Sequence, residues 1–103
     1  MNVFCIVGKV VELPQMKEVS TGVKVSHVRL KVNRPFANSE GIYESDIIQV
    51  EVWRGLAETI CSKTKIDDLL AVKGRIASFA NEKDEHTYYN YSFIAEKVEF
   101  LRH

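Results

Sequence analysis

The chain has 103 residues, which is enough for one domain and leaves no room for a second hydrophobic core. Apolar residues make up 46% of it, which supports a packed core and argues against long disorder. Because 14 basic residues balance 14 acidic ones, net charge does not indicate a polyanionic partner. Any binding of nucleic acid must therefore depend on where the cations lie. We therefore expect residues 1–103 to form a single domain.

The first predicted strand runs from Val3 to Leu13 and is rich in β-branched residues. Gly8 lies inside it, and a glycine within a strand often marks a bulge or a tight bend at the corner of a barrel. This apolar start is too short for a secretion signal, and no segment approaches transmembrane length. We therefore expect a cytoplasmic protein without a membrane partner. Pro14 ends the strand, and Ser20-Thr21-Gly22 predicts a turn.

The second predicted strand, Val23 to Asn33, alternates between apolar and polar residues. One face consists of Val28, Leu30 and Val32, and the other of His27, Arg29, Lys31 and Asn33. This period of two, with a basic face, predicts a half-buried strand whose outer side is cationic. The next segment, Arg34 to Glu44, contains Pro35 and Gly41 and is interpreted as a long loop.

The third predicted strand, Ser45 to Arg54, alternates again. One side carries Ile48, Val50 and Val52, and the other carries Ile47, Gln49, Glu51 and Trp53. A short helical pattern follows from Leu56 to Lys65. Its apolar side consists of Leu56, Ala57, Ile60 and Cys61.

The fourth predicted strand is Leu69 to Ser78, with Gly74 at its middle, and the last is Tyr88 to Leu101. Between them, Phe79 to Thr87 is interpreted as a polar hairpin tip. A short helix between the third and fourth of five strands is the plan of the all-β, five-stranded OB-fold barrel, which commonly binds oligonucleotides. SH3-like barrels and small β-sandwiches share much of the strand count but not the position of the helix.

Several short motifs are spread along nearly the whole chain. They are Asn2, Gly8-Lys9, Pro14, Gly22, Asn33-Arg34-Pro35-Phe36, Glu40-Gly41, Trp53-Arg54, Leu56-Ala57-Glu58, Gly74-Arg75-Ile76 and Ala95-Glu96-Lys97-Val98. With them, the chain resembles the bacterial single-stranded-DNA-binding protein family. The resemblance implies an OB fold, usually a homotetramer, that acts in replication, recombination and repair and is associated with the nucleoid.

The chain departs from the pattern of that family in several places. It stops at His103, whereas replicative members continue into a flexible tail with an acidic tip that recruits other proteins. Either such a tail has been removed, or the chain is a short relative similar to primosomal replication protein N, a dimeric OB protein without a tail. The family often has an aromatic residue where Ile47 stands and another near Asn81, and Ile66-Asp67-Asp68 replaces a basic or glycine turn. These differences predict weaker binding.

Binding a single strand without sequence preference needs exposed aromatic faces for the bases and cations for the phosphates. Trp53 is the first stacking candidate, and its alternative role is a partly buried tryptophan that closes the barrel over the helix. Phe36 is the second, with a loop anchor as the alternative. Phe79 is the third, because it has the same strand parity as Asn81 and could partly substitute for the aromatic residue that the family often has there. Three further aromatics are assigned to the barrel wall or a subunit contact, namely Tyr88, Tyr89 and Tyr91.

Seven cations are candidates for contacts with phosphates. Those of the second strand and its loop are Arg29, Lys31 and Arg34, those of the fourth strand are Lys73 and Arg75, and the track is extended by Lys9 and Lys24. A charged strand face is usually only solvated, so the hypothesis depends on their combination with Trp53 and Phe36.

Catalytic and metal-binding patterns are absent from the sequence. Cys5 and Cys61 lie far apart and are interpreted as reduced thiols. The three histidines have no spacing typical of a metal site or a catalytic triad, and no phosphate-binding loop occurs. Asp67-Asp68 is interpreted as a solvated turn. We expect neither enzymatic activity nor a cofactor.

Three functional hypotheses follow. The first is sequence-independent binding of single-stranded DNA by a homo-oligomer, with a tetramer preferred to a dimer. The second is a primosome accessory protein of the same fold that acts mainly through contacts with replication or primosome proteins. The third is a structural OB module with no nucleic-acid role.

Overall fold

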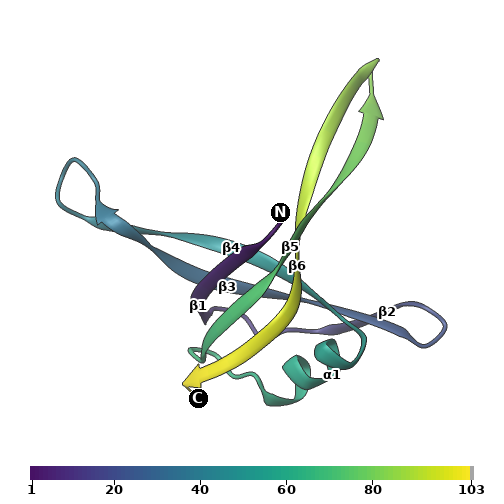
Figure 1. The fold of residues 1–103 in the computed structure, drawn as a ribbon, viewed down its shortest axis with the longest axis horizontal. Helices are drawn as coiled ribbons and strands as arrows, with labels where there is room; N and C mark the ends of the chain where they lie inside the picture. The colour runs from purple at the N-terminus through teal and green to yellow at the C-terminus, as the bar shows by residue number, and fades with distance from the viewer. Residues whose placement is uncertain (103) are drawn as a thin grey trace.

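The computed structural model describes residues 1–102, which form a β-barrel with one helix and two long hairpins projecting from it (Figure 1). The elements are β1 (Phe4–Val10), β2 (Met16–Ser20), β3 (Val23–Ala37), β4 (Tyr43–Trp53), α1 (Arg54–Lys63), β5 (Leu69–Lys83) and β6 (His86–Arg102). The sheet order is β1-β5-β6-β4-β3-β2, and the barrel closes because Lys9 and Val10 of β1 also pair with β3. The predicted all-β barrel with one short helix is confirmed.

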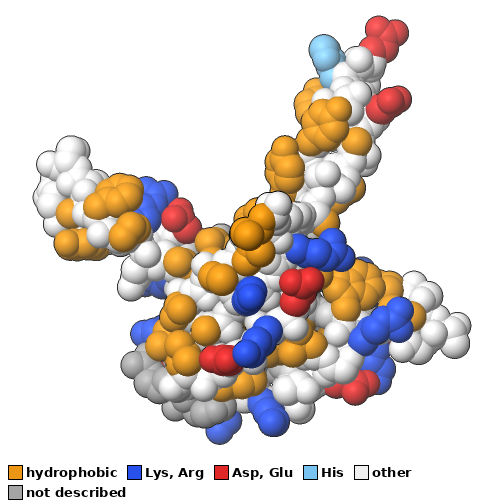
Figure 2. Space-filling view, in the orientation of Figure 1, with side chains coloured by type: hydrophobic (Ala, Val, Ile, Leu, Met, Phe, Trp, Pro, Cys, Tyr) orange, Lys and Arg blue, Asp and Glu red, His pale blue; other side chains and the backbone are white. Residues whose placement is uncertain are grey.

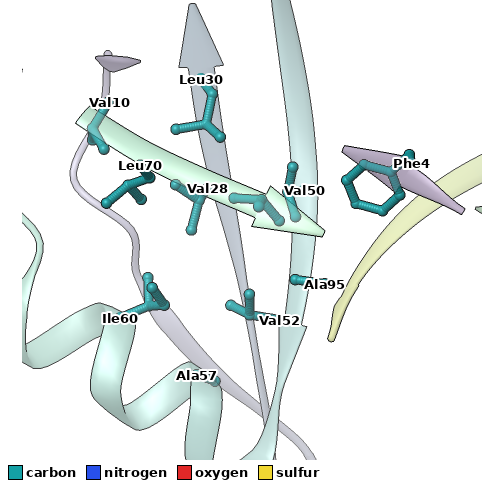
Figure 3. Packing of buried hydrophobic residues seen from close by; sticks show 11 residues of the cluster. Phe4, Val10, Val28, Leu30, Val50, Val52, Ala57, Ile60, Leu70 and Ala95 are labelled. Atoms are coloured by element: carbon teal, nitrogen blue, oxygen red, sulfur yellow. The ribbon is translucent and has the colours of Figure 1, made fainter. Parts of the chain in front are cut away.

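The inner faces of the strands meet in an apolar core, part of which Figure 3 shows. Its largest fully buried apolar side chains are Val10, Leu30, Val50, Val52, Ile60 and Leu70. The alternation predicted for residues 23–33 and 45–54 accounts for the core residues that β3 and β4 contribute. The helix α1 buries Ala57 and Ile60 against this core, as its apolar side predicted. Within residues 1–102, no helix is long and apolar enough to cross a membrane.

Two glycines permit close approaches between strands. A Cβ atom at Gly74 would lie 1.9 Å from the carbonyl oxygen of Ile94, at a point where the pairing of β5 with β6 shifts register. The pairing irregularity therefore lies at Gly74, whereas the sequence pattern indicated a bulge or bend at Gly8. At Gly8, a Cβ atom would lie 2.9 Å from the Cβ of Leu30. Gly8 lies just before the residues at which β1 begins to pair with β3, so it allows the barrel to close.

Three segments contain more strand than the sequence predicted. The strand β2 adds a sixth member to the sheet, and the expected loop 34–44 continues β3 to Ala37 and begins β4 at Tyr43. The expected hairpin tip 79–87 is mostly strand as well. All residues of β2, and all from 78 to 91, are exposed. No apolar alternation marks these ribbons, because their backbone hydrogen bonds rather than burial hold them together.

The expectation of a solvated Asp67-Asp68 turn is wrong for Asp68, which is buried. Its Oδ2 atom accepts a hydrogen bond from the backbone N–H of Lys65 at 2.9 Å. The backbone around it is tied to β1, because the N–H of Val10 donates to the Asp68 carbonyl and the N–H of Asp67 donates to the Val10 carbonyl, both at 2.9 Å. Asp68 therefore has a structural role in holding the loop after α1.

Candidate nucleic-acid interface

The outer face of β3 and β4 brings together many of the predicted polar and cationic side chains. The register places His27 opposite Glu51, Arg29 opposite Gln49, and Lys31 opposite Ile47. Paired residues of antiparallel strands share a face, so these side chains form one surface. Ile47 is 57% exposed, so the surface also presents an apolar contact for a flat ligand.

A groove of about 240 Å³ opens beside this face, between β4 and β6. The two strands pair at Val50–Phe93 and Glu51–Ile94, beyond which the β5–β6 hairpin rises away from the barrel (Figure 1). The lining of this groove includes His27, Ile47, Gln49, Glu51, Tyr91 and Phe93. The combination of an exposed aromatic ring, an apolar side chain and hydrogen-bonding groups is the environment in which an unstacked nucleobase is bound.

A second groove, more polar and of about 510 Å³, continues across β3. It shares His27 and Gln49 with the first groove. It adds Arg29 of β3 and Glu12 and Gln15, which lie between β1 and β2. The two grooves therefore form one path across the outer face of the barrel.

Trp53 lies at the end of β4, where it is the N-cap residue of α1. It is half-buried, so it is neither a core residue nor a fully exposed platform. Its indole Nε1–H donates a hydrogen bond of 2.7 Å to Oε2 of Glu51. On the other side of that carboxylate, Oε1 lies 3.3 Å from Nε2 of His27. Trp53 is thus linked to the first groove through Glu51.

Phe36 and Phe79 lie on different hairpins and do not belong to one site with Trp53. Phe36 is 66% exposed near the end of the β3–β4 hairpin, where Ile42 and Tyr43 are also exposed. Phe79 is exposed on the β5–β6 hairpin. Figure 2 shows hydrophobic side chains at the end of the first hairpin and along the second. Each hairpin therefore carries its own exposed aromatic surface.

The tyrosines of β6 lie on the projecting hairpin rather than in the barrel wall, and Tyr91 is 66% exposed. Tyr91 and Tyr89 share a face with Phe93, whereas Tyr88 shares the opposite face with Phe79. Tyr91 lines the first groove and is the functional candidate that the sequence interpretation missed. The period of two in Tyr89, Tyr91 and Phe93 was the available signal.

The predicted cations fall into separate groups. Lys9 and Lys31 lie opposite each other on β1 and β3 and line a common groove. Lys73 and Arg75 lie on the outer side of β5. Within residues 1–102, none of these four takes part in an ion pair. The other three are paired with carboxylates: Arg29 with Glu12, Lys24 with Glu58, and Arg34 with Asp46 and Glu44.

The pairing of Arg34 changes the protonation equilibria of the β3–β4 hairpin. The hydrogen bond from Arg34 lowers the pKa of Asp46, and the same hydrogen bond raises the pKa of Arg34. Arg34 and Asp46 therefore both remain charged over a wider pH range than usual.

Within the described part of the chain, no cluster of three or more His, Cys, Asp or Glu side chains is placed to hold a metal ion. Cys5 and Cys61 are free thiols.

Residues 1–101 match the model of the single-strand binding protein family. Single-stranded DNA-binding protein 3 of Listeria innocua is 37% identical over 102 residues, which are 98% of this chain and 64% of that protein. Single-stranded DNA-binding protein B of Bacillus subtilis is 33% identical over 102 residues, 97% of this chain and 89% of that protein. The chain thus spans less than two thirds of the length of some relatives and most of the length of others.

Solved structures support the fold. The small single-stranded DNA-binding protein from Streptomyces coelicolor superposes with a TM-score of 0.70 at 18% identity, over 95% of this chain and 92% of that one. A deletion mutant of the single-stranded DNA binding protein from Thermus aquaticus gives a TM-score of 0.81 at 20% identity, over 99% of this chain and 51% of that one. The predicted OB fold is confirmed. The names of the relatives do not favour the primosomal alternative.

Proposed function

Because the chain belongs to the single-strand binding protein family, we propose that it binds single-stranded DNA, largely independently of sequence and without catalysis. One observation carries the proposal: the groove between β4 and β6 combines the exposed Tyr91 and Ile47 with hydrogen-bonding groups, on the face that also carries Lys31. Members of this family are DNA-binding proteins rather than enzymes, in agreement with the sequence interpretation.

In this mechanism the bases stack on exposed rings while the phosphates follow the cations. Base–aromatic stacking contributes about 1–3 kcal/mol per base and tolerates every base. Tyr91 and the partly exposed ring of Trp53 would serve bases near the barrel, and Phe36 and Phe79 would serve bases that reach the hairpins. Lys9 and Lys31 would contact phosphates, because no carboxylate of the described residues neutralises them.

A direct test compares a fluorescently labelled single strand with the duplex of the same sequence by anisotropy. We expect the single strand to bind much more tightly, because bases inside a duplex cannot stack on Tyr91 or Trp53. Equal affinity for the duplex would indicate a purely electrostatic interaction, and no binding of either would leave a structural OB module. The biological roles that we propose are replication, recombination and repair at the nucleoid.

We propose further that the chain forms a homo-oligomer through β1, with a tetramer preferred to a dimer. The outer side of β1 exposes Cys5 and Val7, and Val3, which directly precedes the strand, is exposed as well. Along its length β1 pairs with β5, but it pairs with β3 at Lys9 and Val10 alone among the described residues. The free edge beside Phe4–Gly8 would accept β1 of a second copy around a two-fold axis.

Light scattering with the variant Val7→Lys tests this assembly. We expect the wild-type mass to be that of a tetramer and the variant to be smaller, because a charge would be placed in the apolar contact. Val19→Lys on β2 is the matched control, since Val7 is 50% and Val19 49% exposed. A monomeric wild type at micromolar concentration would contradict the proposal.

A further inference from the structure

We propose that the groove between β4 and β6 reads one base of the bound strand and prefers guanine there through the carboxylate of Glu51. This inference rests on the proposed function and adds to it a base preference at one position. The rest of the strand would still bind by stacking and charge.

Glu51 is placed to present its carboxylate to a base. It lines the groove, and its side chain is 19% exposed, so it is accessible but largely shielded from water. Trp53 donates to one oxygen at 2.7 Å, and His27 Nε2 lies 3.3 Å from the other. Because a carboxylate only accepts hydrogen bonds, both neighbours donate to it, and two donors on different oxygens fix its orientation. Each oxygen keeps a further lone pair for a ligand.

The surroundings of Glu51 suit a base better than a phosphate. A carboxylate repels the phosphate backbone, so the edge of a base rather than its phosphate would approach this point. Tyr91 and Ile47 line the same groove and offer surfaces on which the flat ring could lie. Gln49 adds an amide that can donate to a base carbonyl.

The four bases differ in what they present to such a carboxylate. Guanine alone carries two adjacent donors on its pairing edge, the N1–H and the N2 amino group, beside the O6 acceptor. Cytosine and adenine have one amino donor next to a ring-nitrogen acceptor, and thymine has one N–H between two carbonyl oxygens that a carboxylate repels. Glu51 would therefore accept both guanine donors, while the amide of Gln49 would donate to O6.

The experiment uses the wild-type protein and two short oligonucleotides, one alternating dT with dG and the other alternating dT with deoxyinosine, which lacks the N2 amino group. Loss of one member of a bidentate contact to a charged group should weaken binding by roughly tenfold. Glu51→Gln should abolish the difference, because its amide places an N–H donor where guanine also donates. Glu40→Gln is the matched control for charge, since Glu40 is exposed in the β3–β4 loop. Thermal melting checks that both variants are folded.

A preference for dG over deoxyinosine that disappears in Glu51→Gln and persists in Glu40→Gln supports the inference. Tight and equal binding of both oligonucleotides by the wild type would overturn it while leaving single-strand binding intact. A preference that survives in Glu51→Gln would overturn the assignment to this carboxylate. Failure to bind these strands and oligo-dT alike would overturn the proposed function itself.

Discussion

Arg34 on β3 holds the carboxylate of Asp46 on β4 through two hydrogen bonds, Nε to Oδ2 at 3.2 Å and Nη2 to Oδ1 at 2.8 Å. Its Nη1 atom donates to Glu44 at 2.8 Å. A guanidinium that is already shared by two carboxylates has little net charge to offer a phosphate. The most recognisable basic position of the β3–β4 hairpin is therefore largely neutralised in the free protein.

We predict that Asp46→Asn strengthens the binding of single-stranded DNA, because Nε and Nη2 of Arg34 lose their carboxylate partner and only Nη1 remains paired, with Glu44. The gain should be roughly two- to fivefold at low salt, the range of one exposed ion pair. The slope of log affinity against log salt should steepen by about 0.7, the value for one additional phosphate contact on a single strand. Isothermal titration at several salt concentrations measures both quantities. Glu40→Gln removes the same charge without releasing Arg34, and an identical gain in that variant would count against the explanation.

The pKa of Asp46 sets the pH window of this effect. The hydrogen bond from Arg34 lowers that pKa, so the carboxylate remains charged below the ordinary value of about 3.9. The stabilisation from the pair is present above that ordinary value and is lost as the pH falls through the lowered pKa of the folded state. The difference in DNA affinity between wild type and Asp46→Asn should therefore persist between about pH 7 and pH 5, because Asp46 stays charged throughout that range.

Gly74→Ala should destabilise the barrel by about 3 kcal/mol, the upper part of the usual range for overpacking. The added methyl group would collide with the backbone of Ile94, which cannot rotate away as a side chain could. Gly55→Ala is the control, because no heavy atom lies within 4 Å of its added Cβ and alanine favours a helix by roughly 0.5–1 kcal/mol. Urea unfolding measures both changes, and a neutral Gly74→Ala would show that β5 and β6 can separate here.

Tyr91→Ala should weaken the binding of oligo-dT by about 1–3 kcal/mol, the contribution of one base–aromatic stack. Its effect on unfolding should be small, because the ring is exposed. Tyr88→Ala removes a tyrosine from the opposite face of the same hairpin and should have a smaller effect on affinity. If Tyr88→Ala were the more damaging change, the strand would lie on the face that carries Phe79.

The fold was predictable wherever burial imposes a period of two on the sequence. The alternation around Leu30 and Val50 gave the correct faces of β3 and β4, because their inner residues enter the core. It gave no signal for β2 or for the outer halves of the hairpins, since both faces of those ribbons are exposed. There, strand formation depends on backbone pairing across the turn of each hairpin, which composition does not encode.

The candidate site was predictable in kind but not in arrangement. Exposed outer-face positions such as Lys31 and Ile47 followed from strand parity. The position of Tyr91 beside Ile47 depends on the angle at which β6 leaves β4, and the carboxylate partners of Arg34 depend on the register of a hairpin interpreted as a loop. These relationships arise from tertiary structure and are not contained in local patterns.

The most direct test of single-strand binding in this groove is a titration with oligo-dT, monitored by the fluorescence of Trp53, the single tryptophan of the chain. We predict strong quenching on binding, because a base would stack on the partly exposed ring of Trp53. The indole is placed beside the groove by its hydrogen bond to Glu51. Log affinity should also fall linearly with log salt, with a slope of at least about 1.4 if Lys9 and Lys31 each contact a phosphate. Unchanged fluorescence together with an affinity that does not depend on salt would contradict this account.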